Sequence, residues 1–127
     1  MGVIDDFREH KTYVLPPIEI KHGGENGIFD SDAKYGGESQ EICPGNFTEK
    51  EKRELEALAT VVHNHLRLRH YSRSDFIVSP KRGVYFLEVN TLPKMTKQSL
   101  LPLGLKSVGS SVKDFVHHVL KLTLNKR

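Results

Sequence analysis

The stretch EVNTLPKMTKQSLLP occupies residues 88–102 and follows the apolar run at residues 84–87. Side chains two positions apart in a strand point to the same face, so Glu88 and Asn90 are expected to lie together where a strand ends. A proline, lysines and several hydroxyl side chains come next, and these are potential contacts for an anion. A surface strand does not require this combination, whereas a site that binds a metal ion and phosphate groups would use every part of it.

The residues before this stretch predict a β-hairpin over about residues 73–90. Two β-rich runs, SDFIV and GVYFLEV, flank a turn composition of serine, proline and glycine. If the hairpin is symmetric about residues 81 and 82, Asp75 lies directly across from Glu88, and with Asn90 three oxygen ligands meet on one face. Arg73 is two residues before Asp75 and shares that face.

Spacing alone leaves two interpretations of this face open. Magnesium prefers oxygen ligands, and proteins usually offer it one or two carboxylates while phosphates and water complete the shell. Two facing carboxylates without a cation would repel each other. The alternative is an ion-pair cluster of Arg73, Asp75 and Glu88 on a solvated sheet face.

The length and composition indicate one ordinary folded domain. The chain has 127 residues, of which 37% are hydrophobic and 28% are charged, and this argues against disorder. No apolar run approaches the ~20 residues that span a bilayer, and the start MGVIDDFREHK lacks an apolar signal core. Cys43 is the only cysteine, which excludes an intramolecular disulfide. The net charge of +3 is spread out and gives only weak support for nucleic-acid binding.

The signals along the chain predict an α+β fold, with a mainly antiparallel sheet and helices packed on it. Residues 12–20 are typical of an extended segment that Pro16 and Pro17 keep away from a central position in a sheet. Residues 21–46 form a long polar, glycine-rich connection, which we expect to be a flexible functional loop. A second loop, which contains Pro93 and Gly104, is expected after the hairpin.

Two helices are predicted from their starting residues. Thr48 followed by Glu51 is a capping-box pattern, and apolar residues then recur at helical spacing over residues 55–66. The last helix is expected to begin near residues 110–111, because an acidic residue stands three positions after Ser111.

The hairpin and its surroundings resemble the C-terminal part of D-alanine–D-alanine ligases, which belong to the ATP-grasp superfamily. The resemblance is carried by RSDFIV at 73–78 and by FLEVNTLPKMTKQSLLP at 86–102. Upstream, VLPPIEI at 14–20 is similar to a strand of that family, FDSDAKY at 29–35 to its flexible loop, and ICP at 42–44 to the residues after that loop. Nearly the whole chain is covered, in the order of the family.

The resemblance implies that residues 1–127 form the C-terminal half of an ATP-grasp fold. A complete ligase also has an N-terminal domain that helps to bind the first D-alanine and a central domain that closes over ATP. We therefore expect the chain to be an isolated C-terminal portion that depends on the missing domains and is inactive alone. The complete enzyme is expected to be a homodimer.

The resemblance also implies metal-binding and catalytic roles on the hairpin. Asp75, Glu88 and Asn90 would hold two Mg²⁺ ions, or Mn²⁺ in their place, against the phosphates of ATP, with Glu88 bridging the ions. Arg73 would stabilise the charge that develops on the acyl phosphate and on the tetrahedral intermediate. The implied metal ligands are the same three residues that strand geometry brings together.

Further implied roles fall on two loops. Lys34 would reach the γ-phosphate of ATP, and Tyr35 would help to close its loop. Ser99, with the backbone of Leu100, would hold the carboxylate of the second D-alanine. Lys94 stands where the family normally has glycine, whose N–H is part of an oxyanion hole. Glycine tolerates a positive φ that lysine does not favour, so this departure bears on local geometry and on full activity.

The chemistry implied by the resemblance explains these residue types. ATP phosphorylates the carboxylate of the first D-alanine, and the amine of the second attacks the acyl phosphate to give D-Ala-D-Ala for peptidoglycan. Transfer between anions needs cations and positioning, and a closed loop keeps water away from the acyl phosphate. The expected setting is the cytoplasm, in cell wall and cell shape maintenance, without nucleic acid or membrane as a partner.

Two other functions stand as alternatives. A non-catalytic or divergent binding module that uses the ATP-grasp half as a scaffold is supported by Lys94. A small nucleic-acid-binding domain is supported only by the modest basic excess, and salt-sensitive binding to DNA would favour it.

Overall fold

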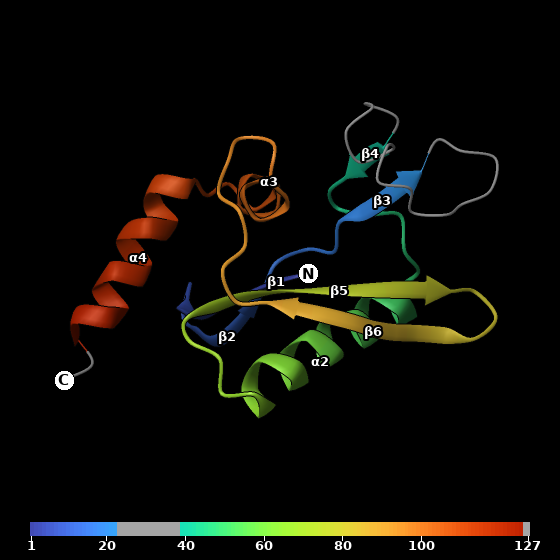
Figure 1. The fold of residues 1–127 in the computed structure, drawn as a ribbon, viewed down its shortest axis with the longest axis horizontal. Coiled ribbons are helices and arrows are strands. Elements are labelled where there is room, and N and C mark those ends of the chain that lie inside the picture. Colours follow the sequence, from blue (N-terminus) through green and yellow to red (C-terminus); the bar gives the residue numbers. More distant parts are fainter. Residues whose placement is uncertain (23–38, 126–127) are drawn as a thin grey trace.

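The computed structural model describes residues 1–22 and 39–125, and these form an α+β fold with two antiparallel sheets (Figure 1). The larger sheet has the strand order β2-β1-β5-β6, and the smaller one pairs β3 with β4. The strands are β1 (Gly2–Phe7), β2 (His10–Val14), β3 (Glu19–His22), β4 (Ser39–Ile42), β5 (Tyr71–Ser79) and β6 (Gly83–Asn90). The helices are α2 (Glu49–His65), α3 (Leu100–Ser107) and α4 (Val112–Asn125). No helix of the described residues is long and apolar enough to cross a membrane. The predicted fold class is confirmed.

The larger sheet is covered on both faces, with α2 on one side and α3 and α4 on the other (Figure 1). Val3 and Ile4 of the central strand β1 are both fully buried, one on each face, because successive strand residues alternate. The main core connects Ile4 to α3 and α4 through Leu15, Leu101, Leu105 and Phe115. The buried residues of α2 are Leu55, Ala59 and His63.

Both predicted helix starts are confirmed. The Thr48 hydroxyl accepts a hydrogen bond from the Glu51 N–H at 3.1 Å, and the Glu51 carboxylate accepts one from the Thr48 N–H at 2.9 Å. At α4, the Ser111 hydroxyl accepts from the Asp114 N–H at 3.1 Å. These bonds satisfy N–H groups that the first helical turn leaves without a partner.

Both predicted loops are wrong in part. The region around Gly104 is helix α3, and the glycine allows close packing: a Cβ added there would lie 3.2 Å from Cδ1 of Leu15. Within residues 21–46, Ser39–Ile42 forms β4 and pairs with Glu19–His22. The two partners of this pairing are distant in sequence, so local signals do not reveal it.

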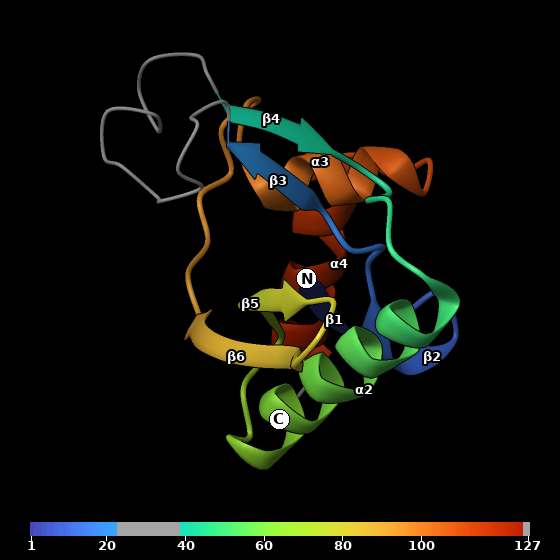
Figure 2. The same ribbon diagram turned by 90° about the vertical axis from the view of Figure 1, so that its right-hand side faces the viewer.

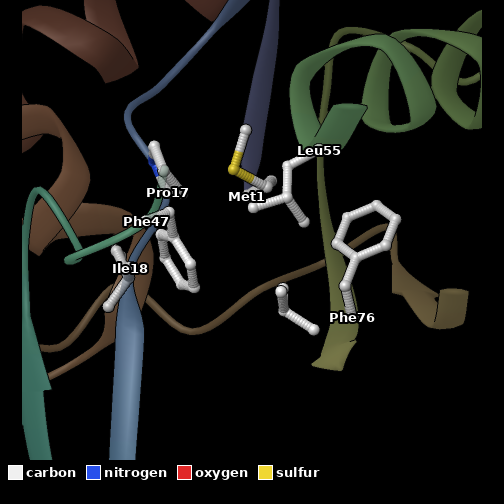
Figure 3. A pocket seen from close by; sticks show the side chains of 7 residues that line it. Met1, Pro17, Ile18, Phe47, Leu55 and Phe76 are labelled. Carbon is white, nitrogen blue, oxygen red and sulfur yellow. The ribbon is translucent and has the colours of Figure 1, made fainter. Parts of the chain in front are cut away.

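A small apolar cavity lies between the segment entering β3, helix α2 and strand β5 (Figure 3). Its volume is about 50 Å³. The lining side chains come from the residue before β1, from the segment entering β3, from the residues leading into α2, and from α2 and β5. They are Met1, Pro17, Ile18, Phe47, Leu55, Phe76 and Val78. Apolar side chains thus meet where the segment leading into the smaller sheet passes α2 and β5.

Helices α2 and α3 end in the same hydrogen-bonding pattern. They differ in which residue takes the left-handed backbone conformation just after the helix. Arg67 follows α2 with a φ of 53°, and Gly109 follows α3 with a φ of 74°. In both cases the N–H of that residue and the N–H of the next one bond back to carbonyls of the last helical turn. This is the Schellman pattern, in which the left-handed position is usually glycine.

We expect Arg67→Gly to raise the free energy of unfolding by about 1 kcal/mol, because glycine adopts a left-handed backbone without the strain that a Cβ causes. Urea unfolding of the parent and the variant measures the difference. Gly109→Arg is the matched control, since it places the same side chain at the equivalent position after α3, where no atom lies within 4 Å of an added Cβ. That change should lower stability by a similar amount. An Arg67→Gly chain no more stable than its parent would show that the arginine side chain offsets its backbone strain.

Candidate functional site

The β5–β6 hairpin arranges the four predicted side chains as two neighbouring cross-strand pairs. Asp75 pairs with Glu88, as the sequence predicted, and Arg73 pairs with Asn90. Residues opposite each other in antiparallel strands share a face of the sheet, as do residues two apart in one strand. The four side chains therefore lie on one face as immediate neighbours.

A β-bulge sets the register of the acid pair. Near the turn, the pairs from Ser79–Gly83 to Phe76–Phe86 are centred on residue 81, so the predicted symmetry about residues 81 and 82 is wrong there. Between Phe76 and Asp75 the partner changes from Phe86 to Glu88, which leaves Leu87 as the extra residue. If the register near the turn continued, Asp75 would face Leu87, and Glu88 would point to the opposite face.

The face that carries these four side chains is the one covered by α3 and α4. Tyr71, two residues before Arg73, packs edge to face on Phe115 of α4, with ring centroids 5.0 Å apart. Ser72 points the other way and lies 2.7 Å from Nδ1 of His63 in α2. Figures 1 and 2 show the smaller sheet on the same side of the hairpin as α3. The candidate site thus faces α3 and the smaller sheet.

Arg73 and Asp75 form an ion pair with two hydrogen bonds. Arg73 Nε donates to Asp75 Oδ1 at 3.1 Å, and Nη2 donates to Oδ2 at 3.2 Å. The two side chains are 18% and 31% exposed. Glu88 is exposed and forms no ion pair with any residue that the structure describes. This face thus carries two carboxylates and one guanidinium, which pairs with Asp75 alone. The excess negative charge favours a further cation.

The donor set fits magnesium. Asp75, Glu88 and Asn90 offer only oxygen ligands, which Mg²⁺ prefers. Asn90 Oδ1 accepts a hydrogen bond from the Leu92 N–H at 2.9 Å, which orients the amide and leaves one lone pair of the oxygen for a ligand. In residues 1–22 and 39–125, no group of three or more His, Cys, Asp or Glu residues is arranged to hold a metal by itself. Two carboxylates and an amide suit an ion whose shell phosphates and water complete.

Ser99 occupies the N-cap position of α3, but its hydroxyl forms no cap hydrogen bond with the helix. Instead, Ser99 Oγ lies within hydrogen-bonding distance of Thr96 Oγ1, and the Ser99 N–H donates to the Thr96 carbonyl at 2.9 Å. The N–H groups of the first helical turn, including that of Leu100, have no partner within the helix. These donors and the helix dipole suit a carboxylate.

The remaining predicted site residues are Lys94, Lys34 and Tyr35. Lys94 is exposed in the stretch between β6 and α3, and its φ is not positive. Lysine therefore fits this position without the backbone strain considered from the sequence. Lys34 and Tyr35 lie outside the residues that the structure describes.

The α-amino group of Met1 lies close to the site. It donates to the Ser74 carbonyl at 2.9 Å. Burial lowers the pKa of this amine to about 6, and the nearby carboxylate of Asp75 partly offsets that effect.

A buried polar network on the other face was not predicted. His63 is fully buried, and its Nε2 lies 3.0 Å from Asp5 Oδ1 while its Nδ1 lies 2.7 Å from Ser72 Oγ. The network joins α2, β1 and β5 on the face of the sheet opposite the Arg73 side chain. Its one sequence signal is the position of His63, four residues after Ala59 on the buried side of α2.

The chain is similar to D-alanine–D-alanine ligases both in a family model and in individual proteins. A family model described as "D-ala D-ala ligase C-terminus" matches residues 1–121. The chain is 37% identical over 127 residues to a D-alanine–D-alanine ligase from Leptospira interrogans, covering 98% of this chain and 36% of that protein. It is 41% identical over 111 residues to a D-alanine–D-alanine ligase from Oleidesulfovibrio alaskensis, covering 87% of this chain and 36% of that protein.

A solved structure shows the same fold. D-alanyl-alanine synthetase A from Vibrio cholerae matches with a TM-score of 0.78 and 29% identity, over 97% of this chain and 37% of that chain. The chain therefore spans little more than a third of the length of the relatives that it matches.

We expect Ser99→Ala to lower the free energy of unfolding by less than Thr48→Ala does. Both residues are N-caps, but only the Thr48 hydroxyl accepts a hydrogen bond from its helix, and losing such a bond costs about 1 kcal/mol. Urea unfolding of the two variants measures the difference. Equal losses would mean that the Ser99 hydroxyl caps α3 in solution and is not free for a ligand.

Proposed function

Because the chain belongs to the D-alanine–D-alanine ligase C-terminal domain family, we propose that it forms the metal–phosphate and second-substrate half of an ATP-dependent ligase. The proposed reaction joins two D-alanine molecules through an acyl phosphate, and the D-Ala-D-Ala product serves peptidoglycan synthesis. The observation that carries the proposal is the Asp75–Glu88 pair, with Asn90 beside it on one face of the hairpin.

In this proposal the hairpin binds the phosphate end of ATP. Asp75, Glu88 and Asn90 hold Mg²⁺, or Mn²⁺ in its place, and bound Mg-ATP supplies the phosphoryl group and neutralises charge during its transfer. Arg73 donates hydrogen bonds to the anionic acyl phosphate. We assign Lys34 to the γ-phosphate and Tyr35 to loop closure from the resemblance of FDSDAKY to the flexible loop of the family.

The carboxylate of the second D-alanine binds at the start of α3. The Ser99 hydroxyl and the Leu100 N–H donate to it, so that the amine of the substrate approaches the acyl carbon from one direction. Lys94 lies in the stretch that links β6 to α3, and we assign its backbone N–H to the oxyanion that forms there. Its ammonium adds a positive charge in the same stretch.

The proposed partners of this chain are the other domains of a ligase, since the chain matches only part of the length of its relatives. The first D-alanine site and the lid over ATP would come from the remaining domains of a ligase, because this chain matches little more than a third of each relative. We propose a cytoplasmic, homodimeric complete enzyme that supports the cell wall and cell shape.

A divergent binding module is the second candidate function, and Lys94 is the observation that favours it. Such a module would bind Mg-nucleotide through the hairpin but would not support ligation when joined to the other domains. Turnover in a complete ligase that carries this chain as its last domain separates the two candidates.

We expect Asp75→Asn and Glu88→Gln to weaken binding of Mg-ATP to this chain by about tenfold or more, because each removes one of the two carboxylates that face the ion. Isothermal titration calorimetry measures the affinity. Glu56→Gln is the control, since it removes the same charge from an exposed position on α2, on the other side of the sheet. Unchanged affinity in both hairpin variants would contradict the proposed metal site.

We also expect the 127-residue chain alone to show no ligase turnover. The first-substrate site and the ATP lid are assigned to parts of the relatives that the chain does not match, so the acyl phosphate cannot form. Phosphate release that depends on D-alanine is the measurement, with a complete relative as the positive control. Steady D-alanine-dependent release by the chain alone would contradict this expectation.

A further inference from the structure

The Arg73–Asp75 ion pair occupies the carboxylate that the proposed metal ion needs. Both oxygens of Asp75 accept hydrogen bonds from the guanidinium, at 3.1 and 3.2 Å. We propose that this pair is a latch: Arg73 holds Asp75 while no metal is bound, and a divalent cation that binds at Asp75 and Glu88 releases Arg73 toward the anionic substrate. The inference rests on the proposed metal site and adds an order of events to it.

The two cations compete because they use the same carboxylate. The planar fork of arginine matches a carboxylate with two parallel hydrogen bonds. Mg²⁺ binds carboxylate oxygens at about 2.1 Å, so the ion and the guanidinium on one carboxylate would lie close enough to repel each other. The side chains of Arg73 and Asp75 are only 18% and 31% exposed, so solvent screens this repulsion incompletely.

Glu88 gives the incoming cation a first contact. It lies directly across from Asp75, is exposed, and forms no ion pair with a residue in the described part of the chain. A divalent ion that meets Glu88 is then adjacent to Asp75 and can take it from Arg73. The free carboxylate and the latched one therefore have different roles in capturing the ion.

A released Arg73 has no carboxylate directly across from it, and its diagonal neighbour on the same face, Glu88, is held by the same cation. Its cross-strand neighbours are Asn90 on β6 and Gly2 on β1, and neither carries a charge. The guanidinium therefore needs a new anion, and the acyl phosphate of the proposed reaction is one. Metal binding would thus prepare Arg73 for the substrate before the reaction begins.

The test is binding of Mn²⁺ alone to the 127-residue chain, measured by the loss of the electron paramagnetic resonance signal of free Mn²⁺. Arg73→Gln removes the charge and the fork, and it should bind Mn²⁺ about tenfold more tightly than the parent, which corresponds to about 1.4 kcal/mol. Arg73→Lys keeps the charge without the fork and should fall between the two.

Arg82→Gln is the matched control for the total charge of the hairpin. Arg82 is exposed and lies in the turn between β5 and β6, away from the acid pair, so its loss should leave Mn²⁺ affinity unchanged. Equal tightening by Arg82→Gln and Arg73→Gln would show a general charge effect and would overturn the latch. Circular dichroism of each variant shows whether the fold is retained.

A second readout follows Arg73 itself in the folded parent chain. The Nε–H of Arg73, assigned by its loss in Arg73→Lys, should shift in the NMR spectrum and exchange faster with water when Mg²⁺ is added. Binding of Mg²⁺ without any change at this group would overturn the latch.

The outcomes separate the latch from the metal site on which it rests. Mn²⁺ binding by the parent that Arg73→Gln does not tighten would overturn the latch and leave the metal site standing. Absence of Mn²⁺ binding in the parent and in Arg73→Gln would overturn both. Tighter binding in Arg73→Gln that Asp75→Asn abolishes would support both.

Discussion

The pairing of β5 with β6 in a single register is the constraint on which the candidate site depends. A strand repeats every two residues, so a slip of one position would turn Glu88 and Asn90 to the face that α2 covers. Ser72 and Ser74 are fully buried on that face, and a carboxylate beside them would lose its water without gaining a cation. The bulge at Leu87 absorbs one residue between the turn and the acid pair, which keeps both carboxylates on the face opposite α2.

Strand β5 carries polar side chains on both faces, and the two sets differ in whether the protein itself supplies their partners. On the α2 face, His63 bonds to both Ser72 and Asp5, so the protein itself supplies the partners of this network. On the opposite face, the guanidinium of Arg73 pairs with Asp75 alone, and Glu88 has no ion-pair partner among the described residues, so its charge is left for a ligand. The two hydrogen bonds of the buried His63 ring help to fix the strand, and the strand in turn holds the incomplete site in position.

The sequence predicted the features whose signals are local. The acid pair, the capping box at Thr48 and the cap at Ser111 each depend on residues that are close along the chain or joined by one short turn. It failed for β4 and α3 and assigned no element to β1. Pairing of β4 with β3 spans the long polar segment, and β1 is recognisable mainly by burial on both faces. In α3, Gly104 indicated a loop, but the glycine is there because Leu15 packs against the helix backbone.

The proposed site separates two kinds of anion by the way each is bound. A triphosphate approaching the hairpin meets Asp75 and Glu88, which repel it unless a divalent cation lies between them. On the proposed function a substrate carboxylate is bound differently, because the start of α3 offers N–H groups and the Ser99 hydroxyl, which does not cap the helix, and these need no metal. Only residues 91–99 separate the two sites along the chain. On the proposed function, this separation lets one domain hold the phosphate of one substrate and the carboxylate of the other without exchange between the two sites.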